Sequence, residues 1–204
     1  MLAGLGNPGA RYAATRHNVG FGTAHRLVDR LAARPLERAA EYAAWQATVP
    51  DGPRAGRALA IVTPLLFMNR SGDALAAFRD RHGLDPAECL VVVDDVYLPL
   101  GRLRLRARGS AGGHNGLASV EAGLGTPDYP RLRLGVGRGE TTTALADHVL
   151  AAFDEDERPA LDEMLERSVD AACAWAAEGI TAAMNRFNVP AREARDDKAP
   201  EGER

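Results

Sequence analysis

The histidine at position 17 is the side chain in this sequence best placed to act as a base. It lies in the segment Thr15–Gly20, between a glycine-rich turn and an amphipathic stretch. Asp94 follows the apolar run Leu90–Val93, and α/β proteins place catalytic groups at that end of a strand. A carboxylate there could accept a hydrogen bond from one imidazole nitrogen and leave the other free to activate water. The alternatives are a structural histidine, and an Asp94 that caps a loop or pairs with an arginine.

The first glycine-rich turn, Gly4–Gly9, formally fits the G-x-G-x-x-G pattern of dinucleotide-binding proteins. That pattern needs a helix that opens through the last glycines, so that its amides meet a pyrophosphate. Pro8 removes one of these amides, and Asp29 falls within a helical pattern rather than at the end of a second strand. We therefore expect the glycines to bend the chain and to turn Asn7 toward a cleft.

A second glycine-rich segment, Gly109–Gly116, also leads into a predicted helix. Amides that open a helix favour anions, so this segment could contact a phosphate or an oxyanion; the alternative is a flexible hinge. His114 and Asn115 could face the cleft. No G-x-S-x-G, H-E-x-x-H or C-x-x-C spacing occurs in the chain, so we expect neither a serine nucleophile nor a metal site.

Arginines alternate with apolar residues along two predicted strands. They are Arg102, Arg104, Arg106 and Arg108 on the first strand, and Arg131 and Arg133 on the second. A period of two places the arginines of each strand on one face. This face could be a solvated exterior opposite buried leucines, or a row of phosphate contacts that positions a nucleic acid without reading its sequence.

The elements that must position these residues alternate between strands and helices, which predicts one α/β domain with a central mixed sheet flanked by helices. Strands are expected at 2–5, 42–49, 57–63, 90–93, 103–106 and 131–136, and helices at 20–33, at 71–82, from about 114, and throughout the C-terminal region from 144. We predict one domain over 1–190 and a polar, disordered tail over 191–204.

The 204 residues are 46% hydrophobic and 26% charged, as in soluble globular proteins. No window approaches the roughly 18 apolar residues of a membrane span, and the start lacks the features of a secretory signal. Cys89 and Cys173 are expected to be buried free thiols, which favours the cytoplasm.

Charge is distributed unevenly along the chain. The net charge is −3, but residues 139–204 carry 16 acidic and 7 basic side chains, whereas the preceding residues carry 12 and 18. This asymmetry fits a basic binding face beside an acidic segment, or a solvated acidic helix without a partner.

Taken together, these segments resemble the bacterial peptidyl-tRNA hydrolases. The similarity is spread over residues 2–189, in order and with compatible spacing. Its parts are Gly4–Gly9 with Tyr12, Thr15–Phe21, Pro64 with Phe67–Gly72, Asp94-Asp95 with Leu98-Pro99 and Gly101, Gly109–Leu117, Arg131–Gly137 and Ala183–Asn188.

The resemblance implies an enzyme that hydrolyses the ester between a peptide and the ribose of tRNA, monomeric, with no cofactor, metal or obligate protein partner. It implies that His17 activates water and that Asp94 orients His17. The other implied site residues are Asn7 in the catalytic centre; Tyr12, Met68, Asn69, His114 and Asn115 around the substrate; and Arg104, Arg106, Arg131 and Arg133 toward tRNA phosphate.

Departures from the family pattern lie outside the implied catalytic residues. Leu65-Leu66 stands where a threonine is common, Tyr97 replaces a common aspartate, and Gly139–Ala144 is short and lacks a basic residue. Two alternatives remain: a non-catalytic RNA-binding relative with the same fold, which the intact His17–Asp94 pair disfavours, and a nucleotide-dependent oxidoreductase.

Overall fold

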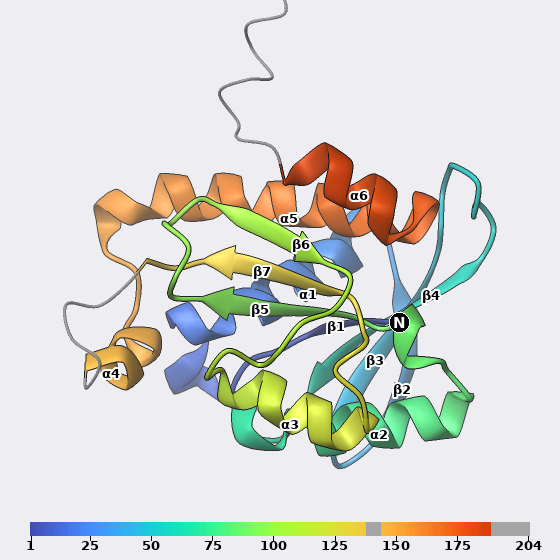
Figure 1. Cartoon of the computed structure of the whole chain (residues 1–204), viewed down its shortest axis with the longest axis horizontal. Helices are drawn as coiled ribbons and strands as arrows, with labels where there is room; N and C mark the ends of the chain where they lie inside the picture. The colour runs from blue at the N-terminus through green and yellow to red at the C-terminus, as the bar shows by residue number, and fades with distance from the viewer. Residues whose placement is uncertain (138–143, 189–204) are drawn as a thin grey trace, which may run out of the picture.

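The computed structural model describes residues 1–137 and 144–188, which form an α/β domain around a seven-stranded mixed sheet (Figure 1). The strands are β1 (Leu2–Gly4), β2 (Arg34–Arg38), β3 (Tyr42–Thr48), β4 (Ala58–Pro64), β5 (Leu90–Asp95), β6 (Leu103–Arg106) and β7 (Arg131–Gly135). The helices are α1 (Val19–Arg30), α2 (Ser71–His82), α3 (Asn115–Leu124), α4 (Ala144–Leu150), α5 (Arg158–Glu178) and α6 (Ile180–Phe187). Short 3₁₀ turns are η1 (Ala10–Tyr12), η2 (Arg16–Asn18), η3 (Met68–Arg70), η4 (Pro86–Glu88) and η5 (Glu155–Glu157). The predicted fold class is confirmed.

The sheet has the strand order β2-β3-β4-β1-β5-β7-β6. The four central strands, β4, β1, β5 and β7, run parallel, whereas β3, β2 and β6 are antiparallel to their neighbours. The carboxyl ends of the parallel strands therefore meet at one edge of the sheet, where α/β proteins bind ligands.

Both faces of the sheet are covered by helices. Figure 1 shows α5 and α6 on one side and α2 and α3 on the other. Along β5, Leu90 and Val92 pack into the core beneath α1 and α5, while Val91 and Val93 pack into the core beneath α2 and α3. This explains the uninterrupted apolar run of β5, since a parallel strand buried on both faces has no polar side.

The glycines of the first turn allow close packing rather than phosphate binding. A Cβ on Gly4 would lie 2.2 Å from the carbonyl oxygen of Gly20, and a Cβ on Gly6 would lie 2.7 Å from the Phe21 ring. The element that follows Gly9 is the short turn η1 and not a long helix. The turn therefore lacks the helix start that a dinucleotide site requires.

The edge strand β2 was not predicted. Its sequence, Arg-Pro-Leu-Glu-Arg, is almost entirely exposed and its register with β3 shifts between Pro35 and Glu37. An edge strand of this kind has neither an alternating pattern nor an apolar run to reveal it.

Other expectations are confirmed in part. Cys89 is buried and Cys173 half-buried, both as free thiols, and burial raises the pKa of each. None of the described helices combines the length and apolar character needed to cross a bilayer. The proposed tail, 191–204, lies outside the described residues.

Candidate active site

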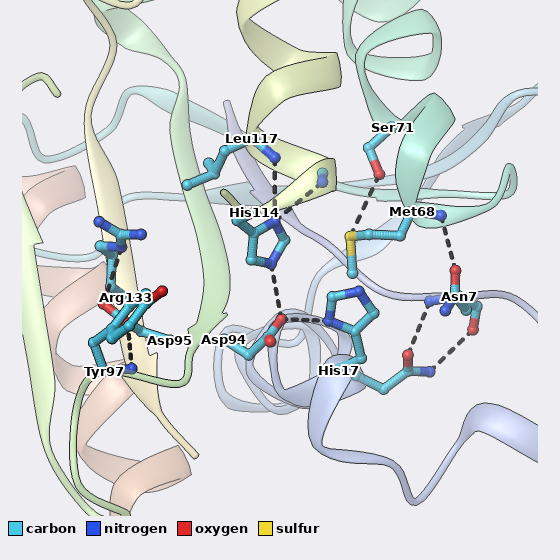
Figure 2. Close-up of polar contacts among 12 residues, drawn as sticks. Asn7, His17, Met68, Ser71, Asp94, Asp95, Tyr97, His114, Leu117 and Arg133 are labelled. Carbon is cyan, nitrogen blue, oxygen red and sulfur yellow. Dashed lines mark hydrogen bonds and ion pairs between the residues drawn. The ribbon is translucent and has the colours of Figure 1, made fainter. Parts of the chain in front are cut away.

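The predicted site residues come together at the carboxyl edge of the parallel strands (Figure 2). Asn7 lies in the loop after β1, His17 in η2, Met68 in η3 before α2, Asp94 at the end of β5, and His114 immediately before α3. These five residues line a cavity of about 490 Å³ together with Asn69 and Asn115. Segments far apart in the sequence thus contribute to one cavity.

Asp94 and His17 form the expected hydrogen bond. The Nδ1 atom of His17 lies 2.8 Å from Oδ1 of Asp94. A carboxylate can only accept, so Nδ1 carries the proton and Nε2 is left with its lone pair. In Figure 2 the second ring nitrogen of His17 points away from Asp94. This is the tautomer that a general base requires.

His114 binds the same oxygen of Asp94 from the other side. Its Nε2 lies 3.0 Å from Oδ1, while its Nδ1 accepts the amides of Gly116 at 3.0 Å and Leu117 at 3.2 Å. Because Nδ1 accepts, Nε2 must carry the proton that is donated to Asp94. The start of α3 therefore fixes the orientation of His114, and His114 in turn helps to fix the carboxylate.

The carboxyl group of Asp94 is almost fully buried, with the residue 1% exposed. Burial alone would raise its pKa, but the hydrogen bonds that His114 and His17 donate to the carboxylate hold the pKa well below its ordinary value. Asp94 is therefore ionised at neutral pH and able to stabilise an imidazolium on His17. The alternative of a loop cap or arginine partner is wrong for Asp94, since it is Asp95 that pairs with Arg133, at 3.1 Å.

Asn7 is held rigidly at the base of the cavity. Its Oδ1 accepts the amide of Met68 at 2.8 Å. The Asn18 side chain brackets its backbone, accepting from the Asn7 amide at 2.8 Å and donating to the Asn7 carbonyl at 3.0 Å. The Oδ1 contact fixes which way the Asn7 side-chain amide faces.

Three of the remaining predicted substrate contacts line the cavity, and the fourth, Tyr12, lies outside it. Asn69 and Asn115 are exposed on the cavity wall, while Met68 is 4% exposed there. Tyr12 is not among the residues that line the cavity; its ring packs edge-on against Phe67, with the centroids 6.2 Å apart. Tyr12 thus stands beside an exposed aromatic ring.

The expected exposed row of arginines is wrong at Arg131. Its side chain is 1% exposed, donates to the carbonyls of Gly109 and Pro127, and lies over the Tyr129 ring at 4.1 Å. Arg133 is half-buried in the cavity wall beside Asp95. The four arginines of the first stretch, Arg102, Arg104, Arg106 and Arg108, are all exposed. Arg104 and Arg106 lie on β6, where they pair with Arg133 and Arg131 of β7.

The start of α3 differs from the expected anion site. The amides of Gly116 and Leu117 are occupied by the His114 ring, so these two donors are not free for a phosphate or an oxyanion. The glycine-rich segment instead brings His114 onto Asp94 and leaves Asn115 in the cavity.

Some residues of the site were not predicted from the sequence. Asn18 follows His17 directly, and its role as the bracket of Asn7 carries no local signal. Leu145, Val149 and Leu150 of α4 line the cavity; their spacing on one helical face was the available signal. The segment before α4 is outside the described residues.

A metal ion fits these side chains less well than a hydrogen-bonded pair. The ligand atoms of His17, Asp94 and His114 lie within 4.8 Å of one another. The imidazole nitrogens that face Asp94 both carry protons in this network, however, and a protonated nitrogen cannot ligate a metal. The arrangement suits a carboxylate that orients one base, with a second imidazole holding the carboxylate.

Comparisons with known proteins agree with this geometry. A family model described as peptidyl-tRNA hydrolase matches residues 1–197. A peptidyl-tRNA hydrolase of Chloroflexus aggregans is 46% identical over 92% of this chain and 98% of its own, and one of Synechococcus is 47% identical over 92% and 82%. The crystal structure of the Acinetobacter baumannii peptidyl-tRNA hydrolase superposes with a TM-score of 0.85 at 28% identity, covering 92% of this chain and 93% of its own. The chain belongs to the peptidyl-tRNA hydrolase family.

Proposed function

We propose that this protein hydrolyses the ester bond between a peptide and the terminal ribose of tRNA, which recycles tRNA from prematurely released peptidyl-tRNA. The observation that carries the proposal is the His17–Asp94 hydrogen bond between two residues that line the cavity. It lies within a chain whose family is named for this reaction.

His17 acts as the general base. Its Nε2 takes a proton from water while the water oxygen attacks the ester carbonyl carbon. The resulting imidazolium is stabilised by the ionised Asp94, and its proton passes to the ribose oxygen as the carbon–oxygen bond breaks. The peptide leaves as a carboxylic acid, which loses the second water proton to solvent, and the tRNA leaves with a free ribose hydroxyl, so no covalent enzyme intermediate is needed.

The side-chain amides supply the polar contacts. The Nδ2 group of Asn7 is directed by its Oδ1 contact to Met68 and donates to the carbonyl oxygen as negative charge develops there. Asn69 and Asn115 can bind backbone groups of the peptide or the terminal nucleotide. Contacts of this kind accept any peptide sequence.

The rest of the substrate is bound through the tRNA backbone. Arg104 and Arg106 are exposed on β6 and hold phosphates, with Arg133 at the margin of the cavity. We expect the protein to act as a monomer in the cytoplasm, without an obligate protein partner.

The test compares wild type with His17→Ala on a peptidyl-tRNA. Wild type should release free tRNA and spare aminoacyl-tRNA, whose amine is free. His17→Ala should lower kcat by about 10²- to 10⁴-fold, the usual range for loss of a general base, with KM little changed. A metal chelator should leave the wild-type rate unchanged.

Two results would contradict the proposal. Wild-type protein without activity would refute the hydrolase assignment and leave the RNA-binding alternative. Equal rates for wild type and His17→Ala would refute the base assignment while keeping the reaction.

A further inference from the structure

Arg16 is a charged residue buried next to the proposed base. It lies in η2 between Thr15 and His17, and its side chain is 6% exposed. The guanidinium donates to the carbonyl of Ala152 and to the Glu157 carboxylate, and stands 4.8 Å from the centre of the Phe153 ring. A buried guanidinium is costly to the fold unless its partners are well placed. The contacts therefore form an anchor that joins two segments 136 or more residues apart.

The partner segment is itself ordered by several bonds. The amide of Arg16 donates to the carbonyl of Ala151 at 3.0 Å, and Thr15 forms an antiparallel bridge with Ala152. Glu157 also accepts the Asp154 amide at 2.8 Å. Burial by itself would raise the pKa of Glu157. The hydrogen bonds from the Asp154 amide and from Arg16 outweigh this effect, so the pKa lies below its ordinary value. The carboxylate that receives Arg16 is thus fixed and ionised.

The side chains of the three consecutive residues of η2 each bind a different part of the chain. Arg16 binds the segment 151–157, His17 binds Asp94, and Asn18 brackets the backbone of Asn7. The segment 151–157 also follows directly on α4, which lines the cavity through Leu145, Val149 and Leu150. Arg16 therefore lies where the loop of the base meets the chain that leaves the cavity wall.

We propose that Arg16, through Glu157 and Ala152, is a positioning residue that holds His17 at the distance and angle from which its Nε2 reaches water in the cavity. This inference rests on the proposed hydrolase function. Neither Arg16 nor Glu157 contacts the substrate. Displacing η2 by 1 Å would misdirect the base, and a displacement of that size can cost about 10²-fold in rate.

A phosphate-binding role for Arg16 does not fit the structure. Both of its terminal nitrogens are engaged by oxygen atoms of the protein. Arg106 on β6, by contrast, is exposed and has no such partner among the described residues. Loss of Arg16 should consequently leave the salt dependence of tRNA binding unchanged.

The test uses the full chain and peptidyl-tRNA, after wild-type turnover has been established. Arg16→Met keeps the packing over Phe153 but removes both polar contacts, and should lower kcat tenfold or more with at most a twofold change in KM. Arg16→Lys, which keeps the charge, should recover part of that loss. Glu157→Gln keeps an acceptor oxygen and should show a smaller loss, a few-fold in kcat.

Arg26→Met is the matched control, because Arg26 also joins the N-terminal part of the chain to the C-terminal part, through ion pairs to Asp162 and Glu166 on α5. Those pairs are on the surface and away from the cavity. Arg26→Met should change the melting temperature by a similar or smaller amount than Arg16→Met and leave kcat within twofold of wild type.

A spectroscopic measurement separates positioning from a merely structural role. In wild type the ¹⁵N signals of His17 should report a single tautomer protonated at Nδ1, and in Arg16→Met a mixture of tautomers. A folded Arg16→Met with wild-type kcat, or with the wild-type tautomer and a loss confined to KM, would overturn the proposal. If Arg16→Met does not fold, Glu157→Gln decides: wild-type kcat in that variant would also overturn it. Inactive wild type would instead refute the proposed function.

Discussion

One oxygen of Asp94 serves two imidazoles, and this sharing determines what each ring can do. The Nδ1 atom of His114 accepts hydrogen bonds from two amides at the start of α3, and its Nε2 donates to Asp94. No ring nitrogen of His114 is left for proton transfer. In His17 only Nδ1 is engaged by Asp94, and Nε2 keeps its lone pair. The two histidines therefore have different roles: His17 can transfer protons, and His114 positions the carboxylate.

The lowered pKa of Asp94 leads to a prediction about acid stability. Because the folded-state pKa is below that of the unfolded chain, ionised Asp94 stabilises the fold above the unfolded value of about 4, and this contribution is lost as pH falls below it. The free energy of unfolding, measured by urea titration, should therefore decline from about pH 5 downward. The decline should be shallower in Asp94→Asn.

Asp128→Asn is a suitable control, since Asp128 is exposed. It should follow the wild-type pH profile. An Asp94→Asn profile parallel to wild type throughout the acid range would show that Asp94 is not held ionised by the two histidines.

At the level of elements, the sequence was informative wherever a pattern reflects burial on one or both faces. The apolar run of β5 and the alternating β6 were predicted for this reason, as was the carboxyl-end position of Asp94. The strand β2 has no such pattern. Arg131 was misplaced because alternation identifies a face of the strand, but not whether the loop at Gly109 and Pro127 covers that face.

The pairing of His17 with Asp94 was predictable from strand polarity, whereas the anchoring of Asn7 and Arg16 was not. Asn18 and Glu157 reach these residues only through the tertiary arrangement, over separations of 11 and 141 residues. Their types, an amide and a carboxylate, occur throughout the chain. Local sequence therefore gives no indication of which copies will be partners.

The contact between α2 and α3 depends on a glycine. A Cβ on Gly72 would lie 1.8 Å from the Ser119 carbonyl oxygen, so Gly72→Ala must separate the two helices. These helices begin next to Met68 and His114, which both line the cavity. We expect Gly72→Ala to destabilise the fold by about 1–3 kcal/mol, as overpacking does, and to lower the melting temperature measured by calorimetry.

The comparison variant is Gly22→Ala in α1. A Cβ there would meet Leu165 at 3.4 Å, an ordinary contact, and alanine favours a helix over glycine. Its melting temperature should equal or exceed that of wild type. A Gly72→Ala variant as stable as Gly22→Ala would mean that α2 and α3 can move apart without cost.

In the molecule as a whole, the acidic side chains of α5 and the exposed arginines of β6 lie on different faces. The acidic side chains of α5, namely Asp162, Glu166 and Asp170, pair with Arg26 and Arg30 of α1. Leu103 and Leu105 of β6 pack into the core on the α5 side of the sheet, so Arg104 and Arg106, which alternate with them, are exposed on the opposite face. The acidic segment is thus partly neutralised within the fold, and the basic strand is left toward solvent.

This arrangement predicts how tRNA binding responds to salt. Each phosphate contact releases counterions, so losing one should reduce the slope of log K against log salt concentration by about 1. Arg106→Ala should weaken binding and reduce the slope in this way, as measured by fluorescence anisotropy with tRNA. Arg30→Ala, on the α1 face, should leave the slope unchanged. Equal slopes for all three proteins would assign Arg106 to the solvated exterior.

The long separation between η2 and its anchor also bears on when the site forms. Residues 15–18 need β5 for Asp94 and the segment 151–157 for Arg16, and α1 packs against α5. During synthesis the amino terminus leaves the ribosome first, so His17 cannot be positioned until most of the chain has been made. Such non-local closure slows folding. A nascent chain that ends before residue 151 has its catalytic histidine but not the segment that anchors its loop, so activity arises only as translation of the domain nears completion.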